Sequence, residues 1–295
     1  MAKAERKSTT TTMKNTIDSE ISGYYPLGLR VGESERLRIQ AEAMAPDAAV
    51  MLDRIEVGDG WRCLDLGCGG GGITDLLAPR VLPSGNVVGV DANPRILEIA
   101  RAWAAEKGLE GTEFVLGDAV ATGLPAGSFD FVHTRFVLST TGLAVEILQE
   151  AVRLTRCGGV VAIEEPDMDG LNCYPENDAF SHLKEILTDG FAAAGADLRL
   201  GKRAYRLMRA QGLTDLQYRP CTVGIRSFDA MVDYLPQTVE SIRPTILENK
   251  LAKPEQLDRL IAECRIHLRD PDTVFTTYLV AQVWGRKGGP ETQSS

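Results

Sequence analysis

Residues 63–74 read CLDLGCGGGGIT, and the fold can be inferred outward from this segment. An apolar run containing one aspartate leads directly into glycines. Gly67, Gly69 and Gly72 match the spacing G-x-G-x-x-G of a strand-to-helix turn that binds dinucleotides. Glycines let the backbone approach a ligand because no Cβ atom intervenes. The spacing alone is a weak signal, so the neighbouring residues have to distinguish a nicotinamide or flavin site from another kind.

Asp65, two residues before Gly67, argues against a dinucleotide. A pyrophosphate bound on this turn would lie beside a carboxylate, and repulsion between like charges is unfavourable in a partly buried site. S-adenosyl-L-methionine fits better, because it carries an α-ammonium group and a sulfonium and has no phosphate. The turn and its aspartate therefore predict S-adenosyl-L-methionine as the cofactor.

Short apolar runs alternate with amphipathic segments around this turn. Strands are expected at residues 61–67, 86–91, 112–118, 129–135, 159–165, 213–225 and 273–287. Helices are expected at residues 73–81, 94–108, 142–156 and 199–212. Such alternation is typical of a parallel sheet covered by helices on both faces. We therefore expect an α/β, Rossmann-like fold whose ligands lie beyond the carboxyl ends of the strands.

Two further carboxylates follow expected strands. Asp91 lies about twenty residues after the glycines, where an acidic side chain accepts hydrogen bonds from a ribose diol. Asp118 ends the next strand, where it can accept from an adenine amino group while the Ala119 amide faces the ring. Each aspartate alone could instead cap a helix. Three carboxylates at three successive strand ends favour a nucleoside site.

Five segments resemble the ordered motifs of class I S-adenosylmethionine-dependent methyltransferases, and the segments GESERLRIQAEAM and HTRFVL are similar to a bacterial branch that methylates small metabolites. The five are CLDLGCGGGG, GVDANP, GDA, FDFVHTRFVL and LTRCGGVVAIEEPD, within residues 61–167. The resemblance implies a seven-stranded, mostly parallel sheet that continues to about residue 286. The segment STTGLA, residues 139–144, departs from the pattern of that branch, so no substrate contact is inferred there.

The resemblance also implies a set of cofactor-binding residues. Arg135 would bind the cofactor carboxylate or a substrate acid, and a surface ion pair is the alternative. The N-terminal segment would fold over the methionine end of the cofactor, although a helix packed on the sheet is an equal alternative. The full set is Tyr24, Arg36, Gln40, Asp65, Gly67, Cys68, Gly69, Asp91, Ala92, Asp118, Ala119 and Arg135.

The chain divides into a core with additions. We expect a disordered arm at 1–20, a helical cap at 21–57, the cofactor-binding core at 58–170, the rest of the sheet at 171–286 and a disordered tail at 287–295. Helical insertions at 171–195 and 227–268 would form a lid. Apolar residues at helical spacing there would line an acceptor pocket or simply join the main core: Phe180, Leu183, Ile186, Phe191, Phe228, Met231, Tyr234 and Leu235.

Methyl transfer needs a positioned nucleophile and, for some acceptors, a base. His133 is the first candidate base because its neutral form is available near pH 7. A histidine packed in the sheet is the competing reading. Glu165 and Asp167 are the next candidates, and a turn set by Pro166 is the alternative for both.

Composition restricts the class of protein. The 295-residue chain has a formal net charge of −9 and no long basic run, so a nucleic-acid partner is not expected. No apolar run reaches the length of a membrane span. Six cysteines without C-x-x-C spacing are typical of reduced thiols in the cytoplasm, and no metal site is expected. The expected assembly is a monomer or homodimer.

The sequence therefore predicts a methyltransferase that acts on an oxygen or nitrogen of a small, moderately apolar metabolite, by direct in-line displacement and without a metal. Two alternatives stay open. One is a carbon methyltransferase that acts on a quinone-like or terpenoid ring. The other is an S-adenosylmethionine-binding protein of the same fold that transfers no methyl group.

Overall fold

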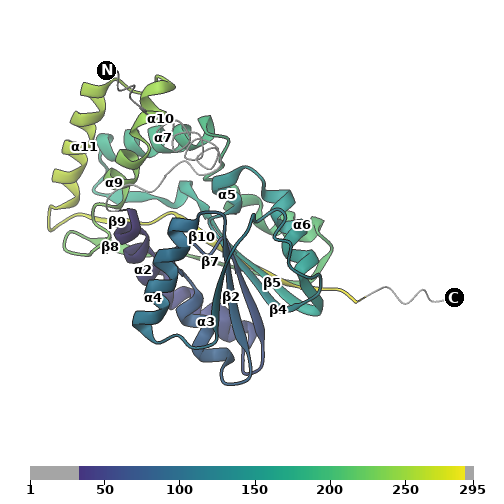
Figure 1. Ribbon diagram of the computed structural model, residues 1–295. Coiled ribbons are helices and arrows are strands. Elements are labelled where there is room, and N and C mark those ends of the chain that lie inside the picture. The colour runs from purple at the N-terminus through teal and green to yellow at the C-terminus, as the bar shows by residue number, and fades with distance from the viewer. Residues whose placement is uncertain (1–32, 290–295) are drawn as a thin grey trace, which may run out of the picture.

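The computed structural model describes residues 33–289, and within that range a seven-stranded sheet has the order β3-β2-β1-β4-β5-β10-β7 (Figure 1). Strands β1 to β5 run parallel, and β10 is antiparallel to both of its neighbours. Its strands are β1 (Arg62–Leu66), β2 (Asn86–Asp91), β3 (Thr112–Leu116), β4 (Phe129–Arg135), β5 (Thr155–Asp167), β7 (Leu213–Cys221) and β10 (Leu279–Lys287). The predicted α/β fold with a mostly parallel sheet is confirmed.

Helices cover both faces of the sheet. Helices α2 (Glu33–Ile55), α3 (Thr74–Val81) and α4 (Pro94–Lys107) lie on one face, together with Cys63 and Phe131 of the strands. Helices α5 (Leu138–Thr141), α6 (Ala144–Leu154) and α8 (Ala204–Ala210) pack with Leu64 and Val132 on the other. The 3₁₀ turn η1 (Met168–Gly170) follows β5, and the 3₁₀ turn η2 (Leu200–Arg203) precedes α8.

Local sequence sets the ends of α4, the helix that follows the second strand. The side chain of Asn93 accepts hydrogen bonds from the backbone N–H groups of Arg95 and Ile96, and Pro94 occupies the first helical position. Gly108 ends the helix at φ +62°. Glycine is preferred there because a side chain disfavours the left-handed conformation. The expected helix at 94–108 therefore forms nearly as the sequence predicts.

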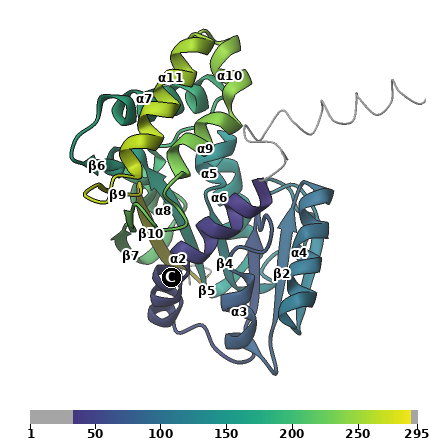
Figure 2. The same cartoon turned by 90° about the vertical axis from the view of Figure 1, so that its left-hand side faces the viewer.

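The helical insertions form a hydrophobic cluster of their own. Helices α7 (Asp178–Ala193), α9 (Tyr234–Ser241), α10 (Arg243–Glu248) and α11 (Pro254–Leu268) contribute most of it. Met168 and Leu171, which follow the carboxyl end of β5, are also buried in this cluster, and Phe136, just beyond β4, packs against it. Figures 1 and 2 show these helices gathered at the end of the sheet where β4 leads into α5. The insertions therefore lie at the edge where a lid was expected.

One of the eight apolar residues expected to line an acceptor pocket or join a core faces solvent. Phe228 is 73% exposed, and the guanidinium of Arg226 stacks on its ring. The other seven residues predicted for the pocket are buried in the insertion cluster. Six of them lie in α7 and α9, where helical spacing identifies the inward-facing side, whereas Met231 and Phe228 both precede α9 in a turn where that spacing carries no information.

Two of the expected strands are each divided in the structure. The segment 213–225 gives β7 and then β8 (Gly224–Arg226), and the segment 273–287 gives β9 (Val274–Thr276) and then β10. Strands β6 (Asn172–Tyr174), β9 and β8 form a separate antiparallel sheet. Thr277 lies between β9 and β10 and provides a hydrogen-bond partner for the chain between β7 and β8, because its hydroxyl accepts from Val223 N at 3.0 Å. Its own N–H donates to the Val223 carbonyl.

Helix α2 packs against both the insertion cluster and the core on the sheet. Its first half contributes Met44 to the insertion cluster, and its second half contributes Ala48, Met51 and Leu52 to the core on the sheet. The expected cap at 21–57 thus includes one helix that contacts both the sheet and the lid helices. Tyr24 and the arm at 1–20 lie outside the described residues, as does most of the tail.

Within residues 33–289, no helix has both the length and the apolar character that crossing a membrane requires.

Candidate functional site

The glycine turn folds back onto the neighbouring strand. The N–H groups of Gly67 and Cys68 both donate to the Val90 carbonyl, at 2.8 and 2.9 Å. Gly67 has φ +74°, and a Cβ there would lie 2.4 Å from a methyl of Val137. Gly69 has φ +53°, and a Cβ there would meet no protein atom within 4 Å. The turn is therefore packed on one side and open on the other, as a ligand cradle requires.

The three predicted carboxylates lie around this turn at different depths. Asp65 is buried and 3% exposed. Asp91 accepts hydrogen bonds from the N–H groups of Gly69 and Asn93, both at 2.9 Å. Burial raises the pKa of Asp91, and these two N–H groups partly offset the rise. Asp118 is exposed two residues beyond β3 and accepts from Val120 N. All three come from the carboxyl ends of adjacent strands.

The smaller residues predicted to bind the cofactor can offer a ligand only their backbone groups. The thiol of Cys68 points into the contacts between α4 and the sheet, and burial raises its pKa well above the usual range. Cys68 can therefore serve a ligand only through its main chain. Ala92 is exposed next to Asp91, and Ala119 is partly buried against the core on the α6 face.

Arg135 extends from the end of β4 over the glycine turn. Its Nη2 donates to the Gly72 carbonyl at 2.8 Å, and a Cβ on Gly72 would lie 2.6 Å from that nitrogen. Its Nη1 is buried without a hydrogen-bond partner among the described residues, 4.0 Å from Oε1 of Glu164. A buried guanidinium nitrogen that lacks an acceptor is suited to bind an anionic group of a ligand.

His133 lies between two buried carboxylates. Its Nδ1 is 3.2 Å from Oδ1 of Asp65, and its Nε2 is 3.0 Å from Oε1 of Glu164. Its exposed fraction is 0%. Burial lowers the pKa of His133, but the hydrogen bonds and charges of the two carboxylates outweigh burial and raise it. The structure therefore does not place His133 where it could accept a proton from a substrate.

The other two candidate bases are also engaged. Glu165 is fully buried on the opposite face of β5, and its two oxygens accept from the N–H groups of Leu138 and Ser139 at the start of α5, both at 3.1 Å. Burial raises the pKa of Glu165 to about 8. Asp167 caps η1 by accepting from Asp169 N. Pro166 thus lies between a helix-capping and a turn-capping carboxylate, as the competing reading held.

A row of polar side chains continues from Glu164 toward the sheet edge. Nε2 of Gln282 donates to Oε2 of Glu164 at 2.9 Å, and Oε1 of Gln282 accepts from Arg219 at 2.8 Å. Arg219 also pairs with Asp47 of α2. Sequence reasoning missed these residues. A glutamine within the apolar run LVAQVWG was the available signal, because a buried amide needs partners.

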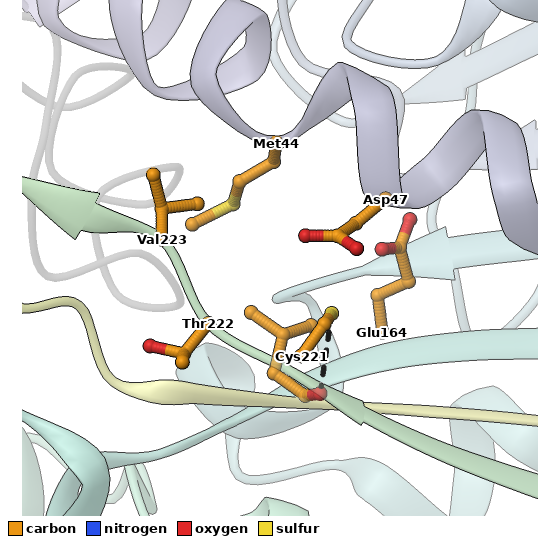
Figure 3. A pocket seen from close by; sticks show the side chains of 7 residues that line it. Met44, Asp47, Glu164, Cys221, Thr222 and Val223 are labelled. Atoms are coloured by element: carbon orange, nitrogen blue, oxygen red, sulfur yellow. Dashed lines mark hydrogen bonds between the residues drawn. The ribbon is translucent and has the colours of Figure 1, made fainter.

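A small cavity lies where this row meets α2. It measures about 10 Å³, close to the lower limit for one water molecule. Figure 3 shows the carboxylates of Asp47 and Glu164 at one side and Met44 and Val223 at the other. Its size excludes a metabolite. In residues 33–289, no group of three or more histidine, cysteine or acidic side chains is arranged to hold a metal ion.

A second cluster lies under the insertion helices. Gln40 donates to the hydroxyl of Tyr278, and Arg36 donates to Oε1 of Gln40 at 3.3 Å. The ring of Tyr278 contacts Phe136 edge-on at 5.5 Å and Tyr234 at 5.7 Å. Burial and Tyr234 raise the pKa of Tyr278 well above the usual range, so its hydroxyl is a donor at neutral pH. The cap helix, the loop after β4 and a lid helix meet here.

A comparison with protein families identifies the chain. The family model of a methyltransferase domain matches residues 58–212, which is more than half of the sequence. The chain belongs to this methyltransferase family. Membership confirms the resemblance to class I enzymes and supports S-adenosyl-L-methionine as the cofactor. The matched residues include the glycine turn and the ends of β1 to β5.

Curated relatives of this chain include methyltransferases named for different small molecules. The chain is 41% identical over 36% of its length to demethylmenaquinone methyltransferase of Lactococcus lactis, of which 42% is covered. It is 34% identical over 42% to nocamycin O-methyltransferase of Saccharothrix syringae, covering 45% of that protein. It is 33% identical over 44% to aklanonic acid methyltransferase of Streptomyces sp. strain C5, covering 59%. The chain spans about half the length of the curated relatives it matches.

Solved structures with this fold have low sequence identity. The YcgJ protein of Bacillus subtilis has a TM-score of 0.55 at 19% identity, over 82% of this methyltransferase and 97% of that chain. Phosphoethanolamine N-methyltransferase 2 of Haemonchus contortus, in complex with S-adenosyl-L-methionine, has a TM-score of 0.51 at 16%, over 82% and 53%. The [4+2]-cyclase SpnF has a TM-score of 0.50 at 18%, over 84% and 82%. These likenesses concern the fold.

Proposed function

We propose that this methyltransferase transfers the methyl group of S-adenosyl-L-methionine to an acidic oxygen of a small, moderately apolar metabolite by direct in-line displacement. A carboxylate or an acidic phenol or enol is the acceptor that fits best. The observation that carries the proposal is the state of the three candidate bases. His133, Glu165 and Asp167 are all held by other groups in the described part of the chain.

The residues at the strand ends would hold the cofactor. The backbone of the turn at Gly67 and Gly69 would approach it, Asp91 would accept from the ribose hydroxyls and Asp118 from the adenine amine. Nη1 of Arg135 would bind the carboxylate, which would give that buried nitrogen its missing acceptor. When bound, the cofactor supplies a methyl carbon activated by a sulfonium whose leaving group is a neutral thioether.

Arg135 carries the clearest test of this cofactor site. Arg135→Gln is expected to weaken S-adenosyl-L-methionine binding by about 1.5–3 kcal/mol, the range for a hydrogen bond to a charged group. Isothermal titration calorimetry on the purified protein measures the change. Arg206→Gln, an exposed position on α8, is the matched control and should bind as the wild type does. Equal affinity in both variants would remove Arg135 from the cofactor site.

An acceptor that is already ionised needs no base from the protein. General-base catalysis contributes about 10²–10⁴-fold where a proton must be removed. For a carboxylate, the rate depends instead on positioning, which can contribute about 7–11 kcal/mol. Arg36, Gln40 and the Tyr278 hydroxyl form a buried polar cluster beside Phe136, and we propose that the acceptor is positioned next to it. Two relatives are named for O-methylation and for an acid substrate, which supports the same class.

Carbon methylation is the second candidate, because one relative is a demethylmenaquinone methyltransferase. A carbon acceptor that must lose a proton would require a base. A cofactor-binding protein without methyl transfer is the third, since the cyclase SpnF has a similar fold. The cysteine pattern and the net charge lead us to infer a cytoplasmic protein that binds no nucleic acid, and we propose that it is a monomer or homodimer.

The acceptor class can be tested directly. The protein is incubated with S-adenosyl-L-methionine and matched sets of apolar aromatic and terpenoid acids, their amides and their amines, and S-adenosylhomocysteine is measured. Turnover is expected with acids or acidic phenols and not with the amides. Its rate should not increase with pH once the acceptor is ionised. Turnover of amines or of ring carbons alone would contradict the proposal.

A further inference from the structure

We propose that His133 is a positioning residue, an imidazolium that links Asp65 of β1 to Glu164 of β5 and, through Glu164, fixes the guanidinium of Arg135 beside the glycine turn. This role rests on the cofactor site of the proposed function. We propose this positioning role for His133 in place of the role of a catalytic base. In this arrangement His133 touches no substrate and acts through the two residues that border the cofactor.

The sheet register brings the four groups together. His133 lies directly opposite Asp65 in the pairing of β1 with β4, and Arg135 lies opposite Glu164 in the pairing of β4 with β5. All four side chains therefore point to the same face at the carboxyl end of the sheet. The exposed fractions of Asp65, His133 and Glu164 are 3%, 0% and 1%. At this depth both ring nitrogens of His133 face carboxylate oxygens.

Hydrogen-bond chemistry selects the charged ring. A neutral imidazole has one N–H donor and one acceptor nitrogen. With both nitrogens against carboxylate oxygens, a neutral ring would direct one lone pair at an anion and leave a buried acceptor without a donor. The imidazolium donates to both Asp65 and Glu164.

The charges nearest to His133 favour a protonated ring. Asp65 and Glu164 contribute two negative charges, and His133 and Arg135 contribute two positive ones. Beyond them, Arg219 pairs with Asp47 of α2 as a second neutral unit. Two further carboxylates act on this cluster, because Asp75 of α3 interacts with Arg135 and Asp91 of β2 interacts with Asp65. A neutral His133 would leave an excess negative charge in the buried cluster.

Loss of the imidazolium would affect the cofactor site through both of its neighbours. Glu164 would keep Gln282 as a donor and would attract Arg135 more strongly, drawing the guanidinium away from the glycine turn. Asp65 would lose the hydrogen bond that orients it. The effect should therefore appear in cofactor affinity, while the reacting atoms remain untouched.

The protonation state can be read directly, because the chain has three histidines. Replacing the other two, His182→Gln and His267→Gln, leaves His133 as the one imidazole in an otherwise native protein. Nitrogen-15 NMR of that protein should show both ring nitrogens protonated at pH 7 to 8. Each outer histidine contacts a single backbone carbonyl, so their replacement should leave the fold intact. A neutral tautomer at pH 7 would overturn the proposal.

Kinetics separate a positioning residue from a base. His133→Gln should raise the Kd for S-adenosylhomocysteine and the KM for the cofactor by about tenfold or more, with kcat at saturating cofactor nearly unchanged. Loss of a base would instead lower kcat by about 10²–10⁴-fold and change the pH profile. That second result would overturn the inference. Failure of the wild type to bind S-adenosylhomocysteine would contradict the proposed function, whereas the NMR result would stand on its own.

Discussion

Glu164→Gln is expected to lower the free energy of unfolding by about 3–5 kcal/mol, the range for removing one partner of a buried ion pair. Glu164 is 1% exposed and accepts from His133 and Gln282. Glutamine keeps the volume but removes the charge that balances His133 and Arg135. Urea unfolding followed by circular dichroism measures the change. Glu98→Gln on the surface of α4 is the matched control and should change stability by no more than about 0.5 kcal/mol.

The pH dependence of this effect has a defined sign. Burial raises the pKa of Glu164, but the hydrogen bond and charge of His133 and the charge of Arg135 outweigh burial and lower it below 4.5. The stabilisation by the carboxylate is therefore present above pH 4.5 and is lost as pH falls through the lowered pKa. The difference between wild type and Glu164→Gln should shrink in acid. A difference that stays constant down to pH 3 would mean that the charge is not its source.

Gly67→Ala should cost about 2–5 kcal/mol of folding free energy, since the left-handed backbone costs about 1–2 kcal/mol and overpacking about 1–3 kcal/mol. The new methyl would lie 2.4 Å from Val137. Thermal unfolding measures the loss. Gly67→Ala with Val137→Ala should recover the packing part and leave the backbone part. No recovery would show that Val137 is not the obstacle.

Gly69→Ala is the matched comparison within the same turn. Its φ is also positive, but its Cβ would meet no protein atom. The folding cost should therefore be limited to about 1–2 kcal/mol, while the methyl projects into the space assigned to the cofactor. Calorimetry should show that Gly69→Ala weakens cofactor binding more than the surface variant Arg206→Gln does. Unchanged affinity would place the cofactor elsewhere on the turn.

Features that depend on local pattern could be read from the sequence. Strand–helix alternation and the glycine turn predicted the positions of β1 to β5 along the chain, since burial and turn formation depend on neighbouring residues. Asp65 and Asp91 were placed at strand ends for the same reason. The inward-facing residues of α7, such as Phe180 and Leu183, were found from their helical spacing.

Features that depend on pairing between distant segments could not be read. Glu164 meets Gln282 118 residues away, and no local signal specifies that partner. The contacts of His133 with Asp65 and Glu164 join three separate strands, so a sequence pattern that suggests a base at His133 does not indicate them. The division between β9 and β10 depends on the hydroxyl of Thr277, which a pattern of apolar and β-branched residues does not distinguish from strand.

Helix α2 has a consequence for synthesis of the protein on the ribosome. Gln40 is made 238 residues before its partner Tyr278, and Met51 shares a buried cluster with Trp284. At about 5–20 residues per second, the helix emerges on the order of 10–50 s before the strand that completes its site. During that interval, its apolar face is available to a chaperone. A pause in translation between α11 and β10 would therefore favour aggregation of the nascent chain more than a pause after β10.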